Sequence, residues 1–502
     1  MVVEMLRANR GHLRPNGHHG CLPTGTGDDA CPHERREIVE SKSLPSPAAG
    51  DAREAALNSK ALRRLLPLVL LMMFMSFVDR SNLAILGGPI SDSLALSATA
   101  FGFATGLFFW GYVIFEIPSN IALMKYGSRA WLARIMISWG LVTALMFLAQ
   151  NELQFGILRF LLGVAEAGLS PGILLFLSMW FAKSKQGKPF TFYQLSLPLA
   201  MIFGSIITSA LLGMFNGIFG ETTGWRWVFL AEGVMTIAIG IVVFFTLPNR
   251  PTDAKWLSAD DAEFMTRRVE AEQRTIKDPY THLTEWQRIA RTLASGKAWY
   301  LAAINLTMLT GFWAVTFWLP QIIAKDFGTN AVNSGLISAI PWAFAFVGIL
   351  LVGRSARRTN DRKWHMFIAL LIGAAGLGLS ATTDNGVLAL IGLTLAVCSV
   401  QVSLPLFYRF QTSVYTGVMT AVLLALVNSI GNFGGFIGPF VFGFSKDFLG
   451  GEGPGLWFMA AFLVIAAVLS LFAERFLGVA KLDDHAVQIA QAATSAERTT
   501  VR

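Results

Sequence analysis

The chain contains 502 residues, of which 54% are hydrophobic and only 14% are charged. An ordinary soluble domain carries roughly 25% charged residues, so this composition excludes one and indicates a membrane protein. The net charge is +8. Because the basic residues lie in short segments beside apolar stretches, and no basic patch has interleaved aromatic residues, the sequence does not indicate nucleic-acid binding.

The first 60 residues are polar, mixed in charge and rich in glycine and proline. They contain no apolar core of the length found in secretory signals, so we predict that residues 1–60 form a disordered cytoplasmic tail. This tail holds Cys21, Cys31 and four of the seven histidines, at spacings that fit no standard zinc site. The third cysteine, Cys398, lies in an apolar segment. We therefore expect no disulfide framework, no metal site and no cofactor.

Twelve apolar segments of bilayer-spanning length follow the tail, six on each side of a polar stretch. The first six lie at residues 65–88, 101–124, 130–149, 153–180, 189–215 and 227–247. The second six lie at residues 297–323, 332–353, 364–382, 386–408, 413–445 and 454–476. The sequence thus predicts an all-α membrane protein with twelve transmembrane helices in two six-helix halves, residues 61–247 and 297–478. Residues 479–502 are predicted to form a second tail.

Basic residues alternate between the loops. The loops after the second, fourth and eighth segments carry several lysines and arginines, whereas residues 87–100 and 150–154 carry none. Because cytoplasmic loops hold the excess of positive charge, both termini are predicted to be cytoplasmic. The polar stretch 248–296 is then a cytoplasmic linker. Its Ser258-Ala259-Asp260-Asp261 resembles a capping box, and the helix formers up to about Gln273 predict a surface helix that ties the two halves together.

Two pairs of ionisable residues lie deep inside apolar segments: Asp79 with Arg80 in the first, and Arg159 with Glu166 in the fourth. An ionised side chain at the centre of a bilayer costs roughly 2.5–3.5 kcal/mol even on insertion scales, so chains keep such residues mainly for function. Arg159 and Glu166 are nearly two turns apart and share one helix face. Asp79 and Arg80 are adjacent and point to different faces. The two pairs predict an ion-coupled transporter for a charged molecule.

Arg80 near the midplane is predicted to bind a substrate carboxylate, because a guanidinium stays charged and forms two hydrogen bonds with it. A carboxyl that alternates between contact with an arginine and an apolar environment can take up and release a proton. We therefore expect Asp79 and Glu166 to carry protons, with Arg159 as their switchable partner and a further substrate ligand. The alternative is a static ion-pair scaffold. Glu116, towards the cytoplasmic end of the second segment, is expected to act at a gate.

Several motifs resemble the anion:cation symporter family of the major facilitator superfamily. They are Phe77-Val78-Asp79-Arg80-Ser81-Asn82, Phe108-Phe109-Trp110-Gly111-Tyr112, Glu116-Ile117-Pro118-Ser119-Asn120, Arg159…Gly163…Glu166, Trp225-Arg226-Trp227-Val228-Phe229, Leu247-Pro248-Asn249-Arg250-Pro251 and Asn428-Ser429-Ile430-Gly431-Asn432. The resemblance covers roughly residues 65–475. It implies a monomeric secondary active transporter of the inner (plasma) membrane, which takes up a small organic anion by alternating access, driven by protons or sodium.

The resemblance also implies further substrate-binding residues. Tyr112 belongs to a family motif, and Asn428 stands at a family position for substrate contact, although a role in helix packing is an equal alternative for Asn428. Trp313 in the seventh segment belongs either to a cavity-lining helix or to an aromatic belt. The bacterial tartrate and aromatic-acid permeases of this family are the most similar in pattern.

The fifth segment bears on the type of substrate. Where hexuronate-type members have a pocket glutamine, this chain has Leu197 followed by Pro198. A pocket without polar partners disfavours a polyhydroxylated sugar acid, so we expect a carboxylate with few hydroxyls. The alternative function is a proton-coupled drug exporter of the same fold, but the fifth segment lacks the Gly-Pro-Gly-rich motif of exporters. The chain has no His-Glu-x-x-His, phosphate-loop or Gly-x-Ser-x-Gly motif, so we predict that it is not an enzyme.

Overall fold

The computed structural model describes residues 47–275, 283–359, 361–415 and 417–478. The predicted tail 479–502 and most of the predicted N-terminal tail, with its cysteines and histidines, lie outside the described residues. All regular structure within the described ranges is helical. Twelve of these helical segments are long and apolar enough to cross a membrane. The predicted fold class, with twelve spans, is therefore confirmed.

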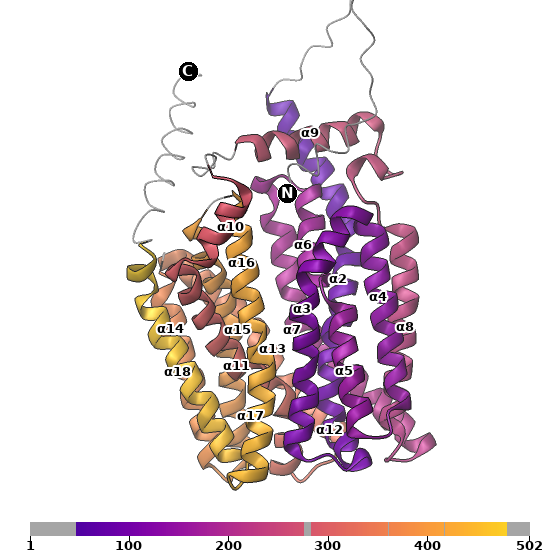
Figure 1. Ribbon diagram of the computed structural model, residues 1–502, viewed down its shortest axis with the longest axis vertical. Helices are drawn as coiled ribbons and strands as arrows, with labels where there is room; N and C mark the ends of the chain where they lie inside the picture. Colours follow the sequence, from indigo (N-terminus) through magenta and orange to yellow (C-terminus); the bar gives the residue numbers. More distant parts are fainter. Residues whose placement is uncertain (1–46, 276–282, 360, 416, 479–502) are drawn as a thin grey trace, which may run out of the picture.

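The two halves lie side by side in Figure 1. The N-terminal half contains α2 (Pro47–Leu94), α3 (Ala98–Tyr126), α4 (Ser128–Leu145), α5 (Glu152–Glu166), α6 (Leu169–Trp180), α7 (Gly187–Phe219) and α8 (Gly224–Thr246). The C-terminal half contains α11 (Gly296–Asp326), α12 (Ala331–Ile337), α13 (Ala339–Thr359), α14 (Lys363–Thr382), α15 (Gly386–Val414), α16 (Gly417–Asn432), α17 (Gly434–Phe448) and α18 (Glu452–Leu477).

The linker helices α9 (Ala259–Thr275) and α10 (Glu285–Leu293) lie at one end of the bundle, at the top of Figure 1. We call this end the linker side and the opposite end the far side. The linker side is the one predicted to be cytoplasmic. Successive spans alternate in direction, so α2 and α16 run from the linker side towards the far side, and α3 runs back. Three short 3-10 turns, Met146–Leu148, Lys183–Lys185 and Pro251–Asp253, complete the connections.

Helix α2 begins at Pro47, inside the segment predicted to be disordered. The prediction is wrong for residues 47–60 because these residues dock on α9 through charged side chains. The guanidinium of Arg53 donates to Asp261 (2.5 Å) and to Asp260 (2.6 Å). The hydrogen bond from Arg53 lowers the pKa of Asp261. This contact therefore stabilises the folded state at neutral pH. The stabilisation is lost only in acid, as the pH falls through the lowered pKa of Asp261.

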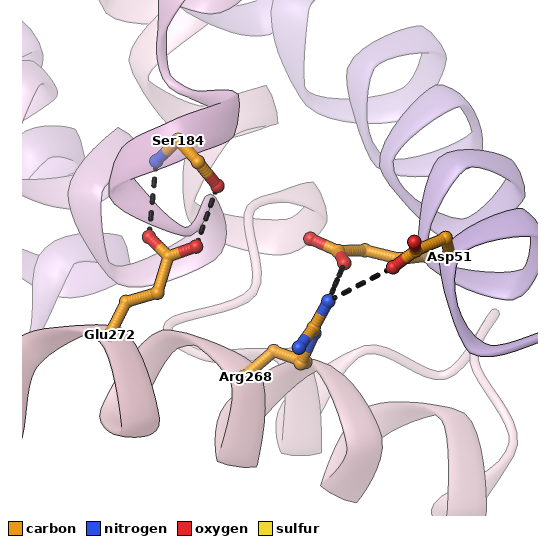
Figure 2. A network of polar contacts seen from close by, with 5 residues as sticks. Asp51, Ser184, Arg268 and Glu272 are labelled. Carbon is orange, nitrogen blue, oxygen red and sulfur yellow. Dashed lines mark hydrogen bonds and ion pairs between the residues drawn. The ribbon is translucent and has the colours of Figure 1, made fainter. Parts of the chain in front are cut away.

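Helix α9 confirms the predicted surface helix but does not tie the halves together as we expected. The carboxylate of Glu272 accepts hydrogen bonds from the backbone nitrogen (3.0 Å) and the hydroxyl (2.6 Å) of Ser184, between α6 and α7. Arg268 reaches Asp51 (3.3 Å) and Glu54 (2.6 Å) of α2 (Figure 2). Helix α10 instead packs against α16. Each half therefore carries its own linker helix, because the polar partners of α9 belong to the N-terminal half.

The two halves meet closely on the far side, where α3 packs against α17. A Cβ on Gly102 of α3 would collide with the backbone of Pro439 on α17, so the helices approach as near as glycine allows. The carboxylate of Asp447 on α17 accepts hydrogen bonds from the backbone nitrogen (2.7 Å) and hydroxyl (2.6 Å) of Thr99. It thus satisfies the first turn of α3, where free N–H groups and the helix dipole favour an anion. One side chain of the C-terminal half closes the far side by capping a helix of the other half.

We predict that Asp447→Ala loosens this far-side closure. The variant leaves the backbone N–H groups of Ala98 and Thr99 without their acceptor, although Ser97 still caps the helix at Ala100, and the loss of a capping acceptor typically costs about 1 kcal/mol. The spacing between spin labels on the exposed far-side residues Glu221 and Asp384, in a cysteine-free background, should then include a longer population than in the parent protein. Asp447→Asn is the matched control, because asparagine also caps helices well. An unchanged distance distribution in Asp447→Ala would contradict the assignment.

Candidate functional site

A cavity of about 100 Å³ lies between the two halves. Its lining combines four apolar side chains with six that carry a polar group, among them one tyrosine. The lining residues are Met73, Ser76, Phe77, Arg80, Phe108, Phe109, Tyr112, Ser170, Asn428 and Asn432. Three predicted substrate-binding residues, Arg80, Tyr112 and Asn428, are therefore brought together there. Arg159 and Trp313 are buried and lie beside this lining without belonging to it.

Arg80 is the cationic residue of the cavity wall. Its Nη2 donates to Oε1 of Glu166 at 2.7 Å, and the same oxygen accepts a hydrogen bond from the hydroxyl of Ser76 at 2.6 Å. Four aromatic rings lie 5.3–5.8 Å from the guanidinium carbon, a spacing that stabilises a cation. These rings belong to Phe77, Phe108, Tyr112 and Trp313. The Nε of Arg80 has no hydrogen-bond partner among the described residues, so the guanidinium retains capacity for a second acceptor.

Arg159 does not form the ion pair that we expected with Glu166 in this conformation. It is 1% exposed, and its guanidinium carbon lies 5.2 Å from the ring of Phe108. It interacts electrostatically with Asp79 and Glu166, but its Nε and Nη2 have no hydrogen-bond partner in the described part of the chain. Oε2 of Glu166 also lacks a partner there. If the side chain of Glu166 turned from Arg80 to Arg159, the unpaired atoms of Glu166 and Arg159 would gain partners. A carboxylate that can pair with either arginine is a switchable partner.

The fourth span is interrupted directly after Glu166. Helix α5 ends at this residue, and α6 begins at Leu169 after a left-handed glycine, Gly168, with φ of 86°. A side chain at Gly168 would be strained in this conformation and would also collide with Ser119 of α3. The interruption places Glu166 at the C-terminal, partially negative end of α5, where a carboxylate needs a cation nearby. Arg80 supplies that cation.

Asp79 lies on the other face of α2, as its position next to Arg80 predicted. Its Oδ1 accepts hydrogen bonds from Thr143 (3.2 Å) and Asn82 (3.3 Å). The amide of Asn82 also donates to Glu232 of α8 at 2.5 Å, and Thr208 of α7 donates to Glu232 at 2.8 Å. Glu232 was not among the predicted site residues. An acidic residue inside the apolar sixth segment carries the same burial signal that singled out Glu166.

Glu116 joins the two halves on the linker side of the cavity. Its Oε1 accepts a hydrogen bond from Nδ2 of Asn428 at 3.1 Å, which connects α3 to α16. Glu116 is 5% exposed and lies one helical turn closer to the linker side than Tyr112. Asn428 therefore both lines the cavity and holds a contact between the halves. This placement fits the gate contact expected of Glu116.

Helix α7 reaches the cavity wall indirectly. The hydroxyl of its Tyr193 is hydrogen-bonded to Ser170 of the lining. Leu197, which we expected to line the pocket, is not among the lining residues, because α2, α3, α6 and α16 form the wall. The nature of the substrate must therefore be argued from the residues that do line it.

The arrangement of two six-helix halves around a central cavity agrees with the sequence comparisons. The sequence model of the Major Facilitator Superfamily matches residues 69–439. The chain belongs to this superfamily. It is similar to "Putative tartrate transporter" of Agrobacterium vitis, with 38% identity over 422 residues that cover 84% of this chain and 92% of the relative. It is also 31% identical over 408 residues to "Quinolone resistance transporter" of Acinetobacter baumannii, covering 81% of this chain and 92% of that one.

Among solved structures, a bacterial homologue of the human lysosomal transporter Spinster, in an inward-facing and unoccupied conformation, has the same fold. The TM-score is 0.67 at 17% sequence identity, and the match covers 82% of this chain and 96% of that one. The family and these relatives are transporters, so this facilitator protein is a multi-pass membrane transporter and not an enzyme.

We predict that Arg80→Ala and Arg80→Lys both weaken anion binding by at least about 10-fold, because a hydrogen bond to a charged group contributes about 1.5–3 kcal/mol. Lysine keeps the charge but loses the fork that holds a carboxylate at two points. Thermal-shift titration with tartrate, benzoate, nicotinate, galactonate and glucuronate provides the measurement. Arg134→Ala, on α4 outside the cavity lining, is the control for the loss of an arginine. Parental affinity in Arg80→Ala would exclude Arg80 from substrate binding.

Proposed function

We propose that this facilitator protein takes up a small organic anion, a carboxylate, by proton-coupled alternating access across the plasma membrane. The observation that carries this proposal is Arg80, a cation in the wall of the cavity between the halves, with unused hydrogen-bonding capacity. Transporters of this kind bind their substrates near the midplane, between two structural repeats. Similarity to a protein named for tartrate supports a carboxylate as the substrate.

The anion binds at Arg80 by accepting two hydrogen bonds from the guanidinium. Tyr112 and Asn428 lie in the same lining and offer a hydroxyl and an amide for the remaining oxygen atoms. The rings of Phe108 and Phe109 form apolar wall around these groups. Hydrogen bonds in such a site are strengthened by the low local polarity. An anion that leaves these polar side chains without a partner therefore binds weakly.

Proton coupling follows from competition for one guanidinium. In this conformation Glu166 occupies Nη2 of Arg80. A proton on Glu166 removes its charge, weakens this ion pair and frees Arg80 for the anion. Proton binding and anion binding therefore favour each other, and the coupling is reciprocal. Loss of the proton later returns Glu166 to Arg80 and displaces the anion. Asp79 and Arg159 form the adjacent pair of charges, and Arg159 holds Glu166 while Arg80 holds substrate.

The gates of the cycle are contacts between the halves. On the far side, Asp447 caps α3 through Thr99 and closes one entrance. On the linker side, Asn428 holds Glu116. An anion that takes the amide of Asn428 removes that contact, so substrate binding and opening towards the linker side are linked. With the linker side cytoplasmic, this order of events releases the anion into the cell.

We predict that Glu166→Gln abolishes accumulation of the anion against its gradient while counterflow exchange persists. Glutamine resembles the protonated acid permanently, so Arg80 stays free to bind substrate but no proton is released. Uptake into proteoliposomes with an imposed pH gradient, and then with a sodium gradient, measures the coupling. Glu263→Gln, on the exposed face of α9, is the matched control. Accumulation at the parental level in Glu166→Gln would remove Glu166 from proton coupling.

The small cavity supports a compact carboxylate in preference to a sugar acid. We predict that tartrate, benzoate or nicotinate competes for uptake at least about 10-fold more strongly than galactonate or glucuronate, because hydroxyls left without partners cost about 1–3 kcal/mol each. Competition against the best labelled substrate gives this ranking. Stronger inhibition by the two sugar acids would contradict the proposed substrate class. It would not affect the prediction for Arg80, which thermal-shift titration tests separately.

Export of an organic compound is the second candidate function, and similarity to the quinolone resistance transporter favours it. The two candidates differ in what the cavity must hold. A guanidinium in the wall attracts an anion and repels a cation, so uptake of a carboxylate agrees better with Arg80. Proteoliposomes preloaded with norfloxacin distinguish the functions: efflux driven by an imposed pH gradient, with no uptake of any carboxylate, would establish the exporter.

A further inference from the structure

Glu232 on α8 is a buried carboxyl without a cation. It is 1% exposed, its Oε2 accepts a hydrogen bond from Nδ2 of Asn82 (2.5 Å), and its Oε1 accepts one from the hydroxyl of Thr208 (2.8 Å). No lysine, arginine or histidine within the described ranges forms an ion pair with it. Neither the cavity nor the proposed coupling pair uses this residue.

The buried charges in contact with α2 do not balance. Apart from Glu116 on the linker side of the cavity, which pairs with Asn428, three carboxyls and two guanidiniums lie around α2. They are Asp79, Glu166 and Glu232, with Arg80 and Arg159. Arg80 holds Glu166 at 2.7 Å, and Arg159 interacts with Asp79 and Glu166. Glu232 is left over. The hydrogen bonds from Asn82 and Thr208 offset part of the cost of a charge on Glu232, but no cation among the described residues does. A buried carboxylate without a cation costs several kcal/mol, so the neutral form is favoured.

The one charged group among the described residues that faces Glu232 increases this cost, and the other groups are neutral hydrogen-bonding side chains. Helix α2 contributes Asp79, the charged side chain that acts on Glu232, and its charge is negative. Helix α7 contributes the hydroxyl of Thr208. Helix α4, which packs along α8, contributes the hydroxyl of Thr143, and that hydroxyl already donates to Asp79. Two neighbouring acids linked by one amide cannot both be ionised cheaply.

Asn82 supplies an independent sign of a missing donor. It is fully buried between the two acids, and its Oδ1 accepts no hydrogen bond from any described residue. Its Nδ2 lies 3.3 Å from Asp79 and 2.5 Å from Glu232. A half-turn of this amide about χ2 exchanges Oδ1 and Nδ2, so that Oδ1 faces Glu232 and the N–H bond to Asp79 is given up, while Thr143 still donates to Asp79. A carboxylic acid O–H is then the donor that Oδ1 needs.

We propose that Glu232 is a second proton-binding site, whose proton stays bound throughout the transport cycle. The proton is stationary because Asn82, Thr208 and Glu232 belong to a single half and, unlike Arg80 beside Glu166, do not line the cavity. Alternating access moves one half against the other and leaves contacts within a half in place. The bound proton balances the buried charge and leaves Asp79 as the anion that faces Arg159. This inference rests on the fold and does not depend on the identity of the substrate.

Infrared spectroscopy of the purified full-length protein tests the bound proton directly. At neutral pH, the wild-type spectrum minus that of Glu232→Gln should contain a carboxylic-acid C=O band that shifts in D₂O and stays constant across the pH range of uptake. Asp253→Gln, at an exposed acid outside the membrane spans, should contribute no such band. A carboxylate band in place of the acid band would show that Glu232 is ionised and would overturn the proposal.

Transport stoichiometry tests whether the proton is stationary. Glu232→Gln, which resembles the protonated acid, should keep uptake within about 2-fold of the parent and leave the reversal potential of proton-coupled transport unchanged. A reversal potential that corresponds to one proton fewer would make Glu232 a carrier and overturn the proposal. A folded Glu232→Gln protein that transports nothing, or that loses a sodium dependence present in the parent, would do the same. The infrared band can be measured without transport. It therefore tests the proton on Glu232 even if the proposed substrate class is wrong.

Discussion

The buried ion pair between Arg80 and Glu166 is the interaction on which the rest of the site depends. Removal of both charges from water costs several kcal/mol per ion, and the pair regains this only through close geometry and additional hydrogen bonds. Ser76 provides such a bond, and aromatic rings surround the guanidinium. The pair is also incomplete, since Nε of Arg80 and Oε2 of Glu166 have no described partner. A contact that is costly and incomplete is one that an anion or a proton can exchange.

Two interrupted helices place the groups that take part in this exchange. The interruption of the fourth span after Glu166 sets this carboxyl at a helix end beside α2. The eleventh span is likewise divided at Phe433, next to the lining residue Asn432. Asp447 closes the far side and Glu116 reaches Asn428 on the linker side, so each entrance depends on a polar contact between the halves. Such contacts exchange with water or substrate more readily than packed apolar surfaces do.

The sequence predicted the helices and the important charges well because both follow from the cost of burying polar groups in a bilayer. This cost applies to a buried charge whatever its neighbours are, so Arg80 and Glu166 could be predicted from a single sequence. The sequence did not identify partners: helical periodicity placed Arg159 and Glu166 on one face, but the carboxyl turns to Arg80 on another helix. The same limitation explains Leu197, whose register on α7 did not show which helices form the cavity wall.

The linker and the N-terminal segment show a different limitation. Residues 47–60 contain a single large apolar side chain, Leu57, so the sequence indicated a tail. Arg53 and Glu54 become ordered only because α9 presents Asp261 and Arg268 to them. Pairing between segments about 200 residues apart leaves no local pattern in the chain. Asp447 was missed for the same reason, because a residue that caps a helix of the other half lies far from that helix in sequence.

Where a buried acid sits relative to the boundary between the halves decides what its proton can do. Glu166 is held by Arg80, which lines the cavity, so its surroundings change when the halves move or an anion binds. The partners of Glu232, Asn82 and Thr208, also belong to its own half, but neither lines the cavity, so its surroundings stay the same when the halves move. Rigid-body motion can therefore release a proton only from the first kind of site. A carboxyl of the second kind contributes by neutralising charge, which leaves Arg159 available to Asp79 and Glu166 in the transport cycle that we propose.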